Sequence, residues 1–142
     1  MQLTDAYDPQ NIFAKILRDE MPSIRIFEDE TTLAFMDIMP QAPGHVLVIP
    51  RVAATNVLTL SADDARAVMT TTHFLAPAVQ KAMEAPGLML AQLNGSAAGQ
   101  TVPHFHMHII PRHRGLEMLG HGTEVVDMDE LTDIATRIRA AI

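Results

Sequence analysis

The chain has 142 residues, of which 48% are hydrophobic, and a formal net charge of −7. This length suits one compact domain with its own core, so we expect 1–142 to form a single domain. The acidic balance argues against a general nucleic-acid binder, which normally carries a basic face. The chain contains no cysteine, which excludes disulfides, thiolate metal sites and cysteine nucleophiles.

The N-terminus and the hydropathy pattern predict where the protein works. The first ten residues, MQLTDAYDPQ, are polar and acidic and lack the basic and apolar regions of a signal peptide. The longest apolar runs are far too short to cross a bilayer. We therefore expect a cytoplasmic protein that has neither a membrane nor a nucleic acid as its partner.

The N-terminal half is predicted to contain one short helix and three strands. Apolar residues that share one face predict a helix over 12–18. Alternation predicts strands over 24–27 and 32–36, which an acidic turn joins as a hairpin. A turn-rich connection then leads to a buried strand over 45–49.

A long amphipathic helix is predicted next. Ser61 begins a capping-box-like sequence, and apolar residues recur at helical spacing from there to about Glu84. Pro77 lies inside this pattern and is expected to kink or split the helix, because it lacks a backbone N–H and clashes with the preceding turn. A further strand is predicted over 88–93.

The C-terminal part is predicted to contain a loop over 94–99, a strand over 104–111, an irregular stretch over 112–126 and a helix over 129–141. Because strands arrive as hairpins with helices inserted between them, the element order favours an α+β fold with a mainly antiparallel sheet. The sequence has no Gly-x-Gly-x-x-Gly and no Walker-type phosphate loop, so a Rossmann or P-loop nucleotide site is not supported.

Three histidines at alternate positions of the last predicted strand form the main candidate site. Side chains at i, i+2 and i+4 of a strand lie on one face, about 6.6 Å apart, so His104, His106 and His108 are expected to share a face. A half-buried strand whose polar face merely contains histidine is the structural alternative. Three histidines in register, directly after a glycine-containing loop, favour a functional site.

Two kinds of chemistry fit such a histidine face. One is a metal site, because His-x-His on a strand is suitable ligand spacing and His45 could supply a further nitrogen. The other is phosphoryl or nucleotidyl transfer, because a neutral imidazole is a competent nucleophile at neutral pH. Zinc binding stays open at this point.

The loop before the histidines favours the second chemistry. Its sequence, NGSAAGQTVP over 94–103, is short and rich in small residues. Glycines allow backbone N–H groups to turn towards an anion, and Gln100 and Thr101 add side-chain donors. Joined directly to the histidines, this loop is typical of an anion-binding cradle.

The sequence GQTVPHFHMHIIPR over 99–112 resembles the signature of the histidine-triad family, His-φ-His-φ-His-φ-φ with φ apolar. Further segments are similar to the branch called histidine-triad nucleotide-binding proteins, whose activity is purine nucleoside phosphoramidase. The resemblance covers about 11–112. Those further segments lie at 12–16, 27–29, 34–38, 40–45 and 48–50.

The resemblance implies roles for individual residues. His106 would be the nucleophile that forms a covalent nucleotidyl-histidine, and His104 would orient it, largely through its backbone carbonyl. His108 and His45 would line the phosphate and leaving-group side. The implied phosphate contacts are Asn94, Gly99, Gln100 and Thr101, and the implied nucleoside contacts are Ile12, Phe13, Ile16, Phe35, Asp37 and Ile38.

The resemblance also implies the overall fold and the partners. We expect a five-stranded antiparallel sheet with one long helix and short N- and C-terminal helices, assembled as a homodimer whose sheets continue across the interface. The expected substrate is a purine nucleotide conjugate that yields AMP or GMP. No cofactor is required for this chemistry, although zinc or another divalent metal stays open as a ligand.

Some departures from the branch widen the choice of function. Thr101 stands where the branch usually has serine, and the Gly-Gln-Thr-Val and Ile-Pro-Arg sequences also resemble dinucleoside polyphosphate hydrolases. Tryptophan is absent, so the aromatic C-terminal element of some phosphoramidases has no counterpart. The alternatives are a dinucleoside polyphosphate hydrolase, a nucleotide- or partner-binding module with incidental catalysis, and a zinc-binding protein.

Overall fold

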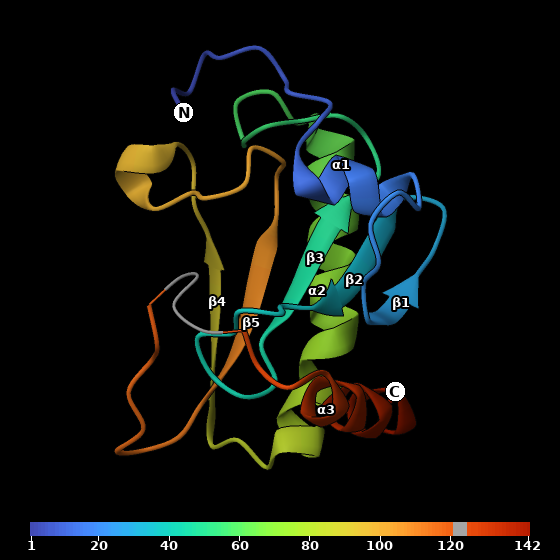
Figure 1. Ribbon diagram of the computed structural model, residues 1–142, viewed down its shortest axis with the longest axis vertical. Helices are drawn as coiled ribbons and strands as arrows, with labels where there is room; N and C mark the ends of the chain where they lie inside the picture. Colours follow the sequence, from blue (N-terminus) through green and yellow to red (C-terminus); the bar gives the residue numbers. More distant parts are fainter. Residues whose placement is uncertain (121–124) are drawn as a thin grey trace.

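The computed structural model describes residues 1–120 and 125–142 (Figure 1). Five strands form one antiparallel sheet in the order β1-β2-β3-β5-β4, which confirms the expected α+β fold. The strands are β1 (Arg25–Glu28), β2 (Thr32–Met36), β3 (Val46–Pro50), β4 (Gly87–Gln92) and β5 (Met107–Arg112), and the helices are α1 (Ile12–Leu17), α2 (Ala62–Met83), the short 3-10 helix η1 (Ser96–Ala98) and α3 (Met128–Ala140).

Each predicted helix and strand is present, and the bounds differ from the prediction by one residue or less, with one exception. That exception is the start of β5, which comes three residues later than predicted. η1 lies inside the predicted loop over 94–99. Of the irregular stretch predicted over 112–126, residues 121–124 lie outside the described part of the chain.

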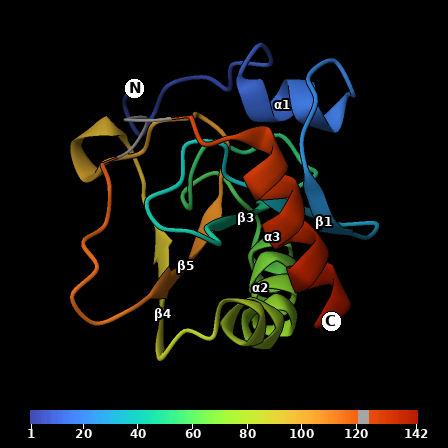
Figure 2. The ribbon, with the colours of Figure 1, turned by 60° about the horizontal axis from the view of Figure 1, so that its bottom comes forward.

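The sheet has two apolar faces because alternate residues of a strand point to opposite sides. α2 and α3 pack on one face, and α1 covers part of the other, as the two views of the ribbon show (Figures 1 and 2). The first face of β2 and β3 presents Ala34, Met36, Val46 and Val48, and the second presents Leu33, Phe35, Leu47 and Ile49, which pack with Phe13 and Ile16 of α1.

α2 begins as the sequence predicts. Ser61 is its N-cap, and the Ser61 hydroxyl oxygen accepts a hydrogen bond from the backbone N–H of Asp64 at 3.1 Å. Pro77 lies inside the helix but does not split it. A proline in a helix interior costs about 3 kcal/mol, whereas each buried Leu or Val side chain contributes about 1.5–3 kcal/mol. Burial of Leu75, Ala78 and Val79 on either side of Pro77 therefore keeps the helix continuous.

The segment between β5 and α3 lies against the loop that follows β2. The backbone N–H of Leu119 donates to the carbonyl of Gln41 at 2.8 Å, and that of Val126 donates to the carbonyl of Ile38 at 3.2 Å. Among the described residues, no helix has both the length and the apolar character that a membrane crossing requires.

Candidate active site

The three histidines lie at the start of β5 rather than along it. β5 begins at Met107, so His108 is within the sheet, while His104 and His106 precede it. Met107 is the first residue of this segment that pairs with the neighbouring strands, opposite Val48 of β3 and Gln92 of β4. The predicted strand over 104–111 is therefore wrong at its start. The histidines are nevertheless brought together, since the ring centroids of His106 and His108 are 4.9 Å apart.

His106 is buried and has a defined ring orientation. Its Nδ1 lies 2.6 Å from the carbonyl oxygen of His104. A carbonyl oxygen only accepts, so Nδ1 carries the hydrogen and donates it. In the neutral ring the lone pair is then on Nε2. The expected role of the His104 carbonyl agrees with this geometry, in which Nε2 is the ring nitrogen without a hydrogen.

His104 is fully buried and is held through both ring nitrogens. Nε2 donates to the carbonyl oxygen of Pro50 at 2.9 Å, and Nδ1 lies 2.7 Å from the hydroxyl oxygen of Tyr7. Burial holds the pKa of the His104 ring below its ordinary value, against the opposing effect of the Pro50 carbonyl. His104 is therefore a neutral, fixed side chain and not a reacting one.

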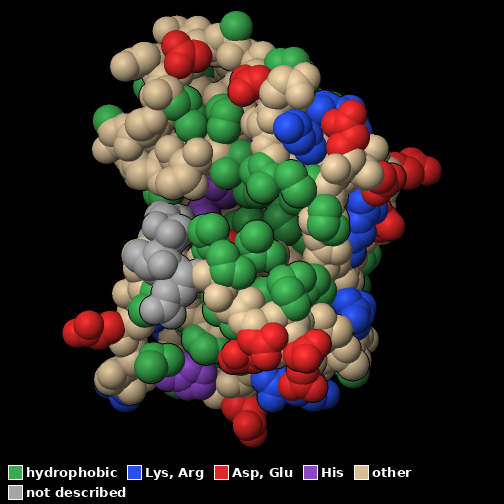
Figure 3. Space-filling view, in the orientation of Figure 1, with side chains coloured by type: hydrophobic (Ala, Val, Ile, Leu, Met, Phe, Trp, Pro, Cys, Tyr) green, Lys and Arg blue, Asp and Glu red, His purple; other side chains and the backbone are tan. Residues whose placement is uncertain are grey.

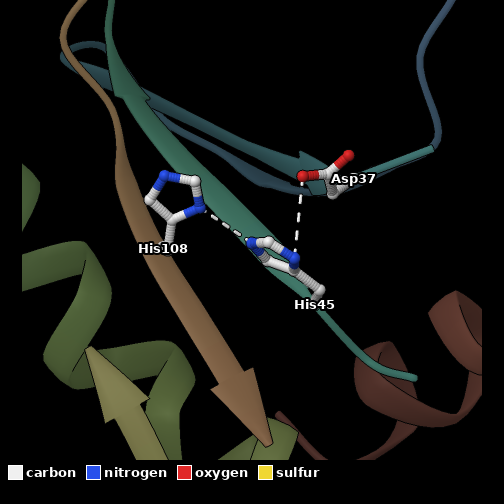
Figure 4. A group of neighbouring side chains, drawn as sticks. All are labelled: Asp37, His45 and His108. Carbon is white, nitrogen blue, oxygen red and sulfur yellow. Dashed lines mark hydrogen bonds and ion pairs between the residues drawn. The ribbon is translucent and has the colours of Figure 1, made fainter. Parts of the chain in front are cut away.

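A second pair of histidines, His45 directly before β3 and His108 on β5, is joined by a hydrogen bond between the rings, and we call this pair the relay (Figure 4). The backbone N–H of Gln41 donates to His45 Nδ1 at 3.0 Å, so the hydrogen of this ring is on Nε2. His45 Nε2 lies 2.8 Å from His108 Nδ1 and donates to it. His108 must then carry its own hydrogen on Nε2. A single backbone N–H thus sets the tautomer of both rings.

Asp37 lies beside this relay, and the group Asp37, His45 and His108 could in principle hold a metal ion, because their ligand atoms lie within 4.8 Å of one another. One carboxylate oxygen of Asp37 is 3.6 Å from His45 Nδ1, and the other accepts from the N–H of Met39 at 2.8 Å. The 3.6 Å contact would be an ion pair only if His45 were protonated, and the Gln41 N–H argues against that. Since both His45 nitrogens already have hydrogen-bond partners, a cation would have to displace one of them, and the arrangement fits a neutral relay better than a metal site.

The loop over 94–101 is held in shape by two glycines and by hydrogen bonds of the Gln100 side chain. Gly95 and Gly99 adopt φ values of +82° and +97°, which favour glycine. The Gln100 side chain is buried, accepts from the N–H of Gly95 at 2.7 Å and donates to the carbonyls of Thr55 at 2.7 Å and Val102 at 3.0 Å. Both amide hydrogens of Gln100 are therefore used within the protein. Its side chain shapes the loop instead of offering the donor that the sequence suggested.

The other predicted phosphate residues differ in how they are held. Asn94 accepts from the backbone N–H of Val57 at 2.8 Å and donates to Gln92 at 2.8 Å, so this side chain joins two loops. Gly99 and Thr101 are exposed. The exposed part of the loop is thus the part that can meet a ligand, and its buried part fixes the shape.

The predicted nucleoside residues separate into a packed group and an exposed group. Phe13, Ile16 and Phe35 are buried in the smaller core cluster, and the Phe13 ring meets His106 edge-on at 5.1 Å. Ile12 and Ile38 are 38% and 39% exposed. Of the packed residues, Phe13 lies against the His106 ring, whereas the exposed residues offer apolar surface. Figure 3 shows apolar side chains around a hollow on this face, with imidazole atoms visible inside it.

Two residues of this site have no signal in the sequence. Gln41 acts through its backbone N–H, which every residue except proline has. Tyr7 lies in a polar N-terminal segment without periodicity, 97 residues away from its partner His104. Only the folded chain brings either of them to the histidines.

Comparison with known proteins gives a family and several relatives. Residues 18–115 match the family model described as "HIT domain". The chain is 41% identical over 102 residues to the Protein hit of Bacillus subtilis, covering 72% of this chain and 70% of that protein. It is 31% identical over 138 residues to the adenosine 5′-monophosphoramidase HNT1 of Saccharomyces cerevisiae, covering 95% and 84%.

A solved structure gives the same result for the fold. The crystal structure of a HIT-like protein from Bartonella henselae, described as involved in cell-cycle regulation and containing an unknown ligand, matches with a TM-score of 0.92 and 45% identity. The match covers 97% of this chain and 100% of that one. The fold expected from the histidine-triad resemblance is confirmed.

Proposed function

The chain belongs to the HIT domain family, and we propose that it is a nucleotide hydrolase that cleaves nucleoside 5′-phosphoramidates at the α-phosphate and releases AMP or GMP. The observation that carries this proposal is the 2.6 Å hydrogen bond from His106 Nδ1 to the His104 carbonyl. It leaves the Nε2 lone pair of a neutral imidazole as the attacking group. The likeness to the yeast adenosine 5′-monophosphoramidase supports this class of substrate.

In the first step, His106 Nε2 attacks the α-phosphorus, a P–N bond to His106 forms and the P–N bond to the amine breaks. The leaving amine takes a proton from solvent, while His108 keeps its one hydrogen on Nε2 and donates a hydrogen bond from it to the reacting group. His106 then carries the nucleotidyl group on Nε2 and a hydrogen on Nδ1, so the ring is positively charged. The His104 carbonyl, already in place, stabilises this charge.

In the second step, a water molecule attacks the same phosphorus and the bond to His106 breaks. The water gives up one proton to solvent, which balances the proton that the amine took in the first step, and the nucleoside monophosphate leaves. Two displacements at one phosphorus thus return His106 to its neutral form, and His108 stays neutral throughout. No metal takes part in either step.

The residues around the histidines bind the rest of the substrate in this proposal. Backbone N–H groups near Gly99 and Thr101, with Asn94, bind the phosphate oxygens, and Gln100 acts by fixing the loop. Asp37 accepts from the ribose hydroxyls. The purine lies on the exposed side chains of Ile12 and Ile38, supported from below by Phe13, Ile16 and Phe35.

We further propose that 1–142 form one domain and that two copies associate along β4. β4 is an edge strand whose residues are mostly half-buried, and a second copy paired there would satisfy its free backbone groups. Sedimentation equilibrium tests this, and a monomer at all concentrations would contradict it.

Radiolabelled adenosine 5′-phosphoramidate, quenched early in the reaction, tests the proposed function. We expect an acid-labile, alkali-stable label on the wild type and none on His106→Ala. Diadenosine polyphosphates assayed side by side identify the preferred leaving group. Unchanged turnover in His106→Ala would refute the mechanism. A binding module would instead retain AMP with no label and no turnover, and a zinc protein would contain stoichiometric metal after purification.

A further inference from the structure

We propose that Tyr7 is a positioning residue of this site, whose hydroxyl group fixes the ring of His104 and, through the His104 carbonyl, the orientation of His106. This inference rests on the function proposed above. The Tyr7 hydroxyl oxygen lies 2.7 Å from His104 Nδ1. The two ring centroids are 5.7 Å apart with an interplanar angle of 68°.

The direction of the Tyr7 hydrogen bond follows from the other side of the His104 ring. The Pro50 carbonyl oxygen can only accept, so His104 Nε2 donates to it at 2.9 Å. His104 Nδ1 is then an acceptor, and Tyr7 must be the donor. Burial raises the pKa of Tyr7, so its hydroxyl keeps the hydrogen that it donates. Without that hydroxyl, a buried ring nitrogen of His104 would lose the donor that satisfies it.

The need for such an anchor comes from the late start of β5. Residues 102–106 are outside the sheet, so no ladder of backbone hydrogen bonds holds them in place. Their position depends on separate contacts. These include the N–H of Phe105 to the Ala54 carbonyl at 2.8 Å, the Gln100 side chain to the Val102 carbonyl at 3.0 Å, and the two hydrogen bonds of the His104 ring. The same residue, His104, presents the carbonyl that receives the His106 hydrogen. A shift of His104 is therefore a shift of the acceptor that aims the nucleophile.

The segment that carries Tyr7 is itself tied to the loops around the site. The carbonyl of Met1 accepts from the N–H of Ser96 at 3.2 Å, and the carbonyl of Leu3 accepts from the Asn56 side chain at 2.9 Å. The dark blue N-terminal segment runs past η1 in both ribbon views (Figures 1 and 2). Tyr7 therefore follows a segment that is anchored at Met1 and Leu3. This anchoring holds the Tyr7 hydroxyl in place against the His104 ring.

Tyr7→Phe tests the proposal because it removes the hydroxyl and keeps the ring. Thr71→Val is the matched control, since it removes a buried hydroxyl hydrogen bond of the same length, 2.7 Å from Thr71 on α2 to Thr32 on β2. We expect Tyr7→Phe to slow labelling of His106 in a single turnover about tenfold, with KM for adenosine 5′-phosphoramidate changed by less than about twofold. Thr71→Val should lower the melting temperature comparably and leave the labelling rate unchanged.

A spectroscopic measurement separates positioning from general destabilisation. In ¹⁵N-histidine NMR spectra, Tyr7→Phe should shift the His104 Nδ1 resonance towards that of an acceptor without a donor and should alter the His106 Nδ1–H signal. Thr71→Val should change neither. Equal labelling rates in the two variants, or an unchanged His106 Nδ1–H signal in Tyr7→Phe, would overturn the proposal.

The two proposals can fail separately. If the wild type forms no labelled histidine and turns over neither substrate, the proposed hydrolase function is wrong. The NMR comparison still decides the role of Tyr7 in that case, because it reads the orientation of His106 without turnover. A changed His106 Nδ1–H signal supports positioning, and an unchanged one overturns it.

Discussion

The buried, neutral His104 should make the stability of the folded chain depend on pH. Burial lowers the pKa of this ring from the ordinary value of 6.5, although the Pro50 carbonyl acts in the opposite direction. The folded chain therefore resists a proton that the unfolded chain accepts.

The sign of the effect follows from proton linkage. Below pH 6.5 the unfolded chain carries a proton on His104 that the folded chain does not, so the free energy of unfolding rises with pH in this range. The contribution of His104 is fully present above pH 6.5 and is lost as the pH falls towards the lowered pKa of the folded state. For one excluded proton, the slope approaches about 1.4 kcal/mol per pH unit.

Urea unfolding at several pH values between about 5 and 7.5 measures this slope. The test variant is His104→Gln, because the amide of glutamine can both donate to the Pro50 carbonyl and accept from Tyr7 but does not titrate. We expect the free energy of unfolding of the wild type to fall more steeply on acidification than that of His104→Gln, by up to about 1.4 kcal/mol per pH unit.

His73→Gln is the control for the loss of an imidazole as such. His73 is exposed on α2, so His73→Gln removes an imidazole without changing a buried contact. His73→Gln should therefore follow the wild type. If the slopes of the wild type and His104→Gln coincide throughout this range, the folded chain accepts a proton at His104, and the argument from burial is refuted.

Three further substitutions test other parts of the structure. Gly44→Ala should destabilise the protein by about 2 kcal/mol in urea unfolding, because Gly44 has a φ of +88° and a Cβ there would lie 2.6 Å from Met83 Cγ; unchanged stability would contradict this geometry. Gln100→Ala removes three hydrogen bonds. It should lower the free energy of unfolding by about 3 kcal/mol and weaken AMP binding in calorimetry. A loss of binding without a loss of stability would instead indicate a direct phosphate contact. Phe13→Leu loses the edge contacts with Phe35 and His106. It should lower the free energy of unfolding by about 1–3 kcal/mol and slow the labelling of His106. An unchanged labelling rate would show that the aromatic contact does not support His106.

Local patterns in the sequence predict most of the fold. β2 has the predicted bounds, because its alternation places two different apolar sets on the two faces of the sheet. Ser61 begins α2 as the capping pattern indicates. Pro77 shows the limit of local reasoning: its cost is local, but the burial that outweighs it depends on how α2 packs against the sheet.

The start of β5 could not be predicted from its own residues. Alternation of histidine with apolar residues continues back to His104, yet the pairing stops at Met107, which lies opposite the last residue of β4, Gln92. The bounds of a strand depend on its neighbours, and the neighbours are distant in sequence. The prediction placed all three histidines on one face of a strand. It was wrong because only His108 lies in the strand.

The candidate site was predicted by residue type but not by contact. The hydrogen bond from His106 Nδ1 to the His104 carbonyl agrees with the role that the motif implies for this carbonyl. The nucleophilic role of His106 stays a prediction. The partners of Gln100 lie within its own loop and in a distant segment, so its side chain has a different use from the predicted one. Tyr7 and the backbone of Gln41 were missed because neither carries a local signal.

The contacts that orient the histidines join distant parts of the chain. The sequence separations are 54 residues between His104 and Pro50, 63 between His45 and His108, and 97 between His104 and Tyr7. Contacts between distant residues form slowly, because the entropy of closing long loops must be lost before they stabilise anything. During refolding, the helices should therefore appear well before the imidazoles of the candidate site take up their tautomers. Recovered turnover then reports that both ends of the chain have reached their native places, which makes it a stricter measure of complete folding than recovered helicity.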